Sequence, residues 1–128
     1  MAAPMNIKLK KFDPSNISPN RVVLFIGKRN TGKSVLVRDI LYFHRKVPAG
    51  IVMSPTEESN SFYQDMIPDL FIYNDYKPDV IENIIARQRK CVKNKEPNSN
   101  AFILLDDCMY DKKITKDPNI RGIFMNGR

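Results

Sequence analysis

The sequence has few cysteines and no long apolar run, and each absence excludes a class of protein. Its 128 residues include only two cysteines, Cys91 and Cys108, which are too few for a secreted disulfide framework. Neither lies in a C-x-x-C or Cys/His metal spacing, which argues against zinc and redox chemistry. The longest apolar runs, 22–26 and 101–105, are far shorter than the roughly 20 residues of a membrane helix. We therefore expect one globular domain in a reducing, intracellular setting, neither membrane-spanning nor secreted.

Basic residues outnumber acidic ones, and the excess is unevenly placed along the chain. The formal net charge is +7; residues 1–50 carry +8, residues 51–85 carry −6, residues 86–100 carry +4 and residues 101–128 carry +1. Two basic blocks, around 8–11 and 87–95, could face a polyanion such as nucleic acid. Solvated faces, or charge that offsets a bound nucleotide, explain these blocks about as well.

The apolar segments alternate between strand and helix patterns. Strands are expected at 21–26, 51–53, 70–73 and 102–105, and helices at 33–46, 78–92 and 119–126, with a short amphipathic piece at 62–67. Pro78 suits the first position of a helix, and Asp79 and Glu82 suit its positive end. The pattern predicts an α/β fold with a mostly parallel sheet covered on both faces, built by residues 21–128 after a polar lead-in at 1–20.

Residues 27–34 carry the clearest chemical motif. They read Gly27, Lys28, Arg29, Asn30, Thr31, Gly32, Lys33 and Ser34, which matches G-x-x-x-x-G-K-[ST], the phosphate-binding loop or Walker A motif. The motif follows an expected strand and opens an expected helix, as its mechanism requires. Backbone N–H groups of the loop would bind the phosphates of ATP, Lys33 would reach the β and γ phosphates, and the Ser34 hydroxyl would ligate Mg²⁺. ATP is therefore expected to bind at this loop and the following Val35.

The strand expected at 102–105 ends in two acids, Asp106 and Asp107. Such an ending is common, but beside a phosphate loop it gains meaning, because open α/β sheets bind ligands at the carboxyl ends of their strands. We expect Asp106 to hold Mg²⁺, directly or through water, as a Walker B residue. Asp107 would orient or deprotonate the attacking water. Cys108 beside them is interpreted as a small apolar filler.

The stretches 22–34, 102–108 and 121–128 together resemble the DNA-packaging ATPases of nucleocytoplasmic large DNA viruses, members of the FtsK-HerA group of P-loop motors. The resemblance implies a P-loop NTPase three-layer sandwich and a Mg²⁺-dependent ATPase, a hydrolase working as a homo-oligomeric ring. Its partners would be double-stranded DNA and capsid components, in the host cytoplasm, a viral factory or the virion. Arg128 occupies the position of the motors' arginine, a candidate for catalysis in trans, and Asp107 stands where relatives often have Glu.

In that group the strand after the arginine inserts between the phosphate-loop strand and the acidic strand. The resemblance therefore implies that this chain is an N-terminal part, with a sheet incomplete at its C-terminus and two apolar strand edges unpaired. Two other functions also fit the phosphate loop. One is a small nucleoside or nucleotide kinase, which would need an acceptor site and an arginine-rich lid; no lid segment is recognisable. The other is a nucleotide-binding module with little turnover.

Overall fold

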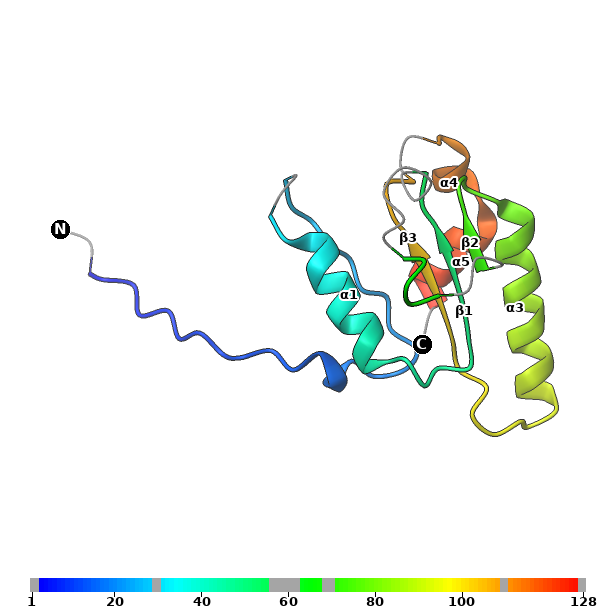
Figure 1. Ribbon diagram of the computed structural model, residues 1–128, viewed down its shortest axis with the longest axis horizontal. Helices are drawn as coiled ribbons and strands as arrows, with labels where there is room; N and C mark the ends of the chain where they lie inside the picture. Colours follow the sequence, from blue (N-terminus) through cyan, green and yellow to red (C-terminus); the bar gives the residue numbers. More distant parts are fainter. Residues whose placement is uncertain (1–2, 29–30, 56–62, 68–70, 109–110, 127–128) are drawn as a thin grey trace.

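The computed structural model describes residues 3–28, 31–55, 63–67, 71–108 and 111–126 (Figure 1). The described elements are a 3-10 turn, η1 (Pro14–Asn16), α1 (Lys33–Phe43), β1 (Ala49–Met53), β2 (Ile72–Tyr73), α3 (Pro78–Lys93), β3 (Ala101–Leu105), α4 (Lys113–Lys116) and α5 (Pro118–Asn126). The alternation of helix and strand expected after residue 33 is confirmed. The boundaries differ: α1 ends at Phe43 rather than near Lys46, and β2 is shorter than the expected strand at 70–73.

The strands form a small parallel sheet in the order β2-β1-β3, so β1 is central. β1 pairs with β3 along its whole length, from Ala49 opposite Ala101 to Met53 opposite Leu105. The chain passes from β2 to β3 through helix α3, since parallel neighbours need a long crossover. An α/β fold with a parallel sheet is therefore confirmed.

Different helices cover the two faces of this sheet, and Figure 1 shows α1 on one side and α3 on the other. Alternate strand residues point to opposite faces. On one face, Ile51 and Met53 of β1 lie in an apolar cluster with residues of α3, α4 and α5. On the other face, Val52 lies in a second cluster with Val37 of α1 and Tyr63. The expectation of a sheet covered on both faces is thus met.

The strand expected at 21–26 is wrong for this structure. No residue of that segment pairs with the described sheet. Val22, Val23, Leu24 and Ile26 are 43%, 46%, 70% and 87% exposed. Phe25 is half buried and packs against the cluster that contains Val52. The physical reason is that no strand of the described chain lies beside the segment, so its backbone has no ladder to join.

The buried strand expected at 102–105 is present as β3, but all five residues of β3 are only half buried. β3 forms one edge of the described sheet, with β1 as its neighbour. One side of its backbone ladder is therefore open. The described sheet thus ends at a strand that has apolar residues on both of its faces.

Gly50 lets β1 and β3 pack closely. It pairs with Phe102 across the ladder. A Cβ atom at position 50 would lie 2.1 Å from Cε1 and 2.2 Å from Cζ of Phe102, so the phenyl ring lies directly on the glycine backbone. A ring laid over a glycine of the neighbouring strand is a device that fixes strand register.

The start of the chain is separate from the sheet. Described residues 3–13 form neither helix nor strand, and Figure 1 shows them extending away from the rest of the molecule. The turn η1 follows, with Asp13 Oδ1 accepting a hydrogen bond of 3.0 Å from the N–H of Ser15. His44 Nε2 lies 2.9 Å from the carbonyl oxygen of Pro14, which places η1 against the end of α1. No helix of the described residues is long and apolar enough to cross a membrane.

Candidate functional site

The described part of the phosphate loop folds onto itself. Thr31 Oγ1 donates a hydrogen bond of 2.7 Å to the carbonyl oxygen of Lys28, which closes a short turn. A Cβ atom at Gly27 would lie 2.8 Å from Thr31 Oγ1, so glycine permits this close approach. Arg29 and Asn30, both expected to bind phosphate, lie outside the described residues.

Helix α1 begins without a group that would neutralise its positive end. Gly32 is the N-cap and has a φ of 91°, a left-handed conformation that favours glycine. No described side chain caps this end, and the first turn contains no acidic residue. The first N–H groups of a helix have no carbonyl partner within it, so those of Lys33, Ser34 and Val35 can receive an anion. Lys33 is half exposed, and Ser34 and Val35 are exposed.

Asp106 lies directly after β3 and is held at two points. Its N–H donates to the carbonyl oxygen of Met53 at 3.0 Å, which continues the ladder between β1 and β3. Its Oδ2 accepts a hydrogen bond of 2.8 Å from the hydroxyl of Tyr63. Asp106 is half buried, and by strand alternation it shares a face with Leu104, which packs in the cluster on the α1 side. The carboxylate therefore has a defined position on that side of the sheet.

Asp107 and Cys108 lie in contrasting surroundings. Asp107 is exposed and has a φ of 54°, in the left-handed region that few residues other than glycine adopt. Cys108 is 2% exposed, and its Sγ lies 3.2 Å from the carbonyl oxygen of Met53. Burial raises the pKa of this thiol to about 11, so it stays protonated at neutral pH. The interpretation of Cys108 as an apolar filler is confirmed.

The two halves of the predicted site lie toward the same end of the molecule in Figure 1. No hydrogen bond among the described residues joins 27–34 to Asp106 or Asp107. They are linked instead through apolar packing, because Val37 of α1 lies in one cluster with Tyr63, which bonds to Asp106. The predicted arginine, Arg128, lies outside the described residues.

The described residues fit a nucleotide with its magnesium ion better than a protein-bound metal alone. They contain no group of three or more His, Cys, Asp or Glu side chains placed to hold a metal. Mg²⁺ typically keeps several waters, binds substrate phosphates and takes one or two protein ligands. Ser34 and Asp106 are the predicted ligands, and the close turn at Gly27 with the uncapped start of α1 suits a phosphate group.

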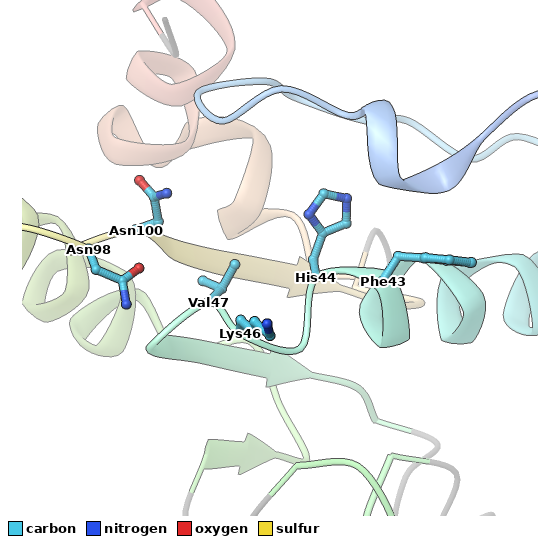
Figure 2. Close-up of a pocket in the computed structure, with 6 residues that line it drawn as sticks. All are labelled: Phe43, His44, Lys46, Val47, Asn98 and Asn100. Carbon is cyan, nitrogen blue, oxygen red and sulfur yellow. The ribbon is translucent and has the colours of Figure 1, made fainter.

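Two cavities lie away from these residues. One, of about 200 Å³, is lined by Phe43, His44, Lys46, Val47, Asn98 and Asn100 (Figure 2). Because Val47 precedes β1 and Asn100 precedes β3, this cavity lies at the amino ends of the strands, opposite to Asp106. The other, of about 540 Å³, lies between α3, α4 and the start of α5. Neither is lined by Lys33 or Asp106 among the described residues, so neither is the candidate site.

Sequence reasoning missed two buried tyrosines. Tyr63 lies 43 positions before its partner Asp106 and belongs to no motif. Its only signal is an aromatic residue after a polar loop that follows an expected strand. Tyr76 donates a hydrogen bond to Asp117, and burial followed by this bond raises the pKa of the Tyr76 hydroxyl above its usual range. Asp117 Oδ1 also accepts from the N–H of Asn119 at 2.8 Å, so this second pair holds the start of α5.

Comparison with known proteins finds viral relatives whose names state no activity. The chain is 39% identical over 138 residues to Uncharacterized protein 075L of Invertebrate iridescent virus 6. It is 35% identical over 130 residues to Uncharacterized protein L437 of Acanthamoeba polyphaga mimivirus, and 34% identical over 134 residues to Uncharacterized protein 015R of Frog virus 3 (isolate Goorha).

These alignments cover 100%, 94% and 95% of this chain but 54%, 46% and 42% of the relatives. No family model matches the chain. No solved structure matches it either. The chain is therefore similar to viral proteins of which it spans about half the length.

Proposed function

We propose that this chain binds Mg-ATP at residues 27–35 and is the nucleotide-binding part of a motor that packages double-stranded viral DNA. The observation that carries the proposal is the start of α1, where the full phosphate-loop motif meets an uncapped helix end with no acid in its first turn. Backbone N–H groups and the helix dipole favour an anion at such an end. The viral source of the relatives agrees with a viral role.

Each predicted residue has a separate role in this proposal. Lys33 places its ammonium group against the β and γ phosphates. Ser34 and Asp106 hold Mg²⁺, which when bound neutralises charge on the transferred phosphoryl group. Asp107 is exposed and orients the attacking water. Arg128 contributes positive charge to the site of a neighbouring subunit in the ring.

The proposal includes a complete P-loop sandwich, in which 21–26 becomes a strand. Two observations support a further strand between this segment and β3: the apolar residues at 22–26 are largely exposed, and β3 has an open edge. The relatives extend well beyond the aligned region, which leaves room for such a strand. A strand paired on both sides would satisfy the backbone groups of both neighbours.

Nucleotide binding is tested with a fluorescent ATP analogue and the Lys33→Ala variant. Removing a charge-assisted contact to phosphate costs about 1.5–3 kcal/mol, so we expect affinity to fall about 10- to 100-fold. Lys46→Ala is the matched control, because Lys46 is an exposed lysine beyond the other end of α1. Equal binding by the Lys33→Ala and unsubstituted proteins would show that the site is assigned wrongly.

The motor is tested by ATP turnover of the protein at its natural full length, with and without duplex DNA. A motor couples hydrolysis to its track, so we expect duplex DNA to raise turnover and a nucleoside acceptor to leave it unchanged. Turnover raised by a nucleoside or nucleotide acceptor, and indifferent to DNA, would establish the kinase alternative instead. Tight ATP binding with little turnover in every condition would establish a nucleotide-binding module.

A further inference from the structure

Tyr63 is the most deeply placed aromatic residue near the candidate site. It is 1% exposed and is the largest of the fully buried side chains in the described chain. Its ring lies in the cluster that contains Val37 of α1 and Val52 of β1. Its carbonyl oxygen accepts hydrogen bonds from the N–H groups of Met66 and Ile67 at 3.1 and 3.0 Å, which form one tight turn. Both the backbone and the ring of Tyr63 are therefore fixed.

The hydroxyl of this fixed ring reaches Asp106. It donates to Oδ2 at 2.8 Å, from a segment 43 positions away in the sequence. The χ2 angle of an aspartate is intrinsically broad, so a single directed hydrogen bond largely decides which way the carboxylate faces. Because Oδ2 is engaged by Tyr63, Oδ1 is the oxygen that would face an ion.

The same residue also connects the two halves of the site. α1 carries the phosphate loop at its start, and its buried residue Val37 lies in the cluster with Tyr63. β3 carries Asp106 at its end, and the Tyr63 hydroxyl bonds to that residue. Tyr63 thus lies between the helix that would bind phosphate and the acid that would bind Mg²⁺.

We propose that Tyr63 is a positioning residue that fixes the Asp106 carboxylate for Mg²⁺ of the bound nucleotide; this inference rests on the proposed function. Partners that hydrogen-bond a metal-ligating carboxylate orient it, and their loss typically lowers metal affinity or activity about 10- to 100-fold. A tyrosine suits this task because its ring is anchored in the apolar core while its hydroxyl reaches a polar edge.

The test is the Mg²⁺ dependence of binding of a fluorescent ATP analogue by Tyr63→Phe, which keeps the ring and removes the hydroxyl. We expect the Mg²⁺ concentration at half-maximal binding to rise about 10- to 100-fold. Binding in EDTA, which reports the phosphate loop alone, is expected to stay unchanged. Tyr76→Phe is the matched control, because it removes another buried hydroxyl that bonds to an aspartate, Asp117, away from the site.

A purely structural role for Tyr63 predicts a different result. Both variants would then lose stability while their Mg²⁺ dependence stayed equal to that of the unsubstituted protein, and this outcome overturns the inference. In an Asp106→Asn background, Tyr63→Phe should cause no further change in Mg²⁺ dependence, since its effect passes through that carboxylate. A further change of the same size there would also overturn it.

Failure of the proposed function is distinguishable, because the unsubstituted protein would then bind no nucleotide. Should Tyr63→Phe fail to fold, NMR of the unsubstituted protein labelled with ¹³C at tyrosine Cζ gives the answer. The resonance that moves on Asp106→Asn substitution, Tyr63, should also respond to Mg²⁺ in the presence of nucleotide. No response to Mg²⁺, with nucleotide bound, overturns the inference.

Discussion

The packing of Phe102 on Gly50 makes a sharp prediction for Gly50→Ala. The added methyl group would lie 2.1 Å, 2.2 Å and 2.6 Å from three atoms of the phenyl ring, where real contacts are wider than 3.0 Å. The ring packs with the cluster on the α1 side, and Gly50 lies within the β1–β3 ladder, so neither can move away freely. The substitution must therefore displace the ring or separate the two strands.

The magnitude follows from two opposing effects. Forcing extra atoms into a packed core costs about 1–3 kcal/mol, and the severity of this overlap places the cost in the upper part of that range. Replacing glycine with alanine in a strand returns roughly 0.5–1 kcal/mol by restricting the unfolded chain. We expect the free energy of unfolding to fall by about 2 kcal/mol. At a urea m-value of about 2 kcal/mol/M, the midpoint falls by about 1 M.

The assay is urea unfolding followed by circular dichroism at 222 nm, since the chain has no tryptophan. Gly122→Ala is the control, because its Cβ would meet nothing within 4 Å and it lies in α5, where alanine is favoured by about 0.8–1 kcal/mol. In a Phe102→Leu background the ring is gone, so Gly50→Ala should be neutral or stabilising. An equal loss of stability in both backgrounds would refute the reasoning, because the cost would then not come from the ring.

Three further predictions concern the site, the partner and the pH response. In the full-length protein, Asp106→Asn should weaken binding of Mg-ATP, whereas Asp107→Asn should keep binding and cut turnover by about 10² to 10⁴; equal loss of binding in both would contradict their separate roles. Lys90→Glu and Lys93→Glu, on the exposed face of α3, should weaken binding to every duplex sequence alike, and the logarithm of affinity should fall linearly with that of salt concentration, by about 0.9 per phosphate neutralised; sequence-dependent loss would argue against phosphate contacts. Burial raises the pKa of Cys108 from 9.0 to about 11, so its thiol stabilises the fold fully below pH 9 and that stabilisation is lost as pH rises toward 11; urea midpoints measured across this range should fall less steeply for Cys108→Ala, and an unchanged slope would exclude the thiol as a cause.

Local signals made helix α3 the most predictable element. Pro78 fixes its first position, and Ile81 and Ile84 recur at helical spacing and are buried as expected. β1 was equally readable in kind, though the strand begins at Ala49, because Gly50 looks like a helix terminator and its strand role depends on Phe102, far along the chain. Turn and cap residues act over a few positions, whereas strand pairing is decided by distant partners.

Two features show what the sequence could not reveal. The segment 21–26 has the composition of a buried strand, but a strand forms only beside a neighbour, and none is present for it in the described chain. The hydrogen bond between Tyr63 and Asp106 joins a turn to a strand end, and no spacing rule links them. Residues of the candidate site could thus be named from the motifs, while the side chain that fixes one of them required the fold.

The exposed segment 22–26 also bears on the solubility of the chain. Its five residues are uncharged and rich in β-branched and aromatic side chains, the composition by which separate molecules stack into cross-β aggregates. Arg21 and Lys28 flank this stretch, and such charges act as gatekeepers because stacked copies bring like charges together. The Debye length falls from about 10 Å at 0.1 M salt to about 3 Å at 1 M, so concentrated salt removes this repulsion. The chain is therefore expected to stay dispersed in dilute buffer and to precipitate as salt is added, unless a neighbouring strand covers the segment.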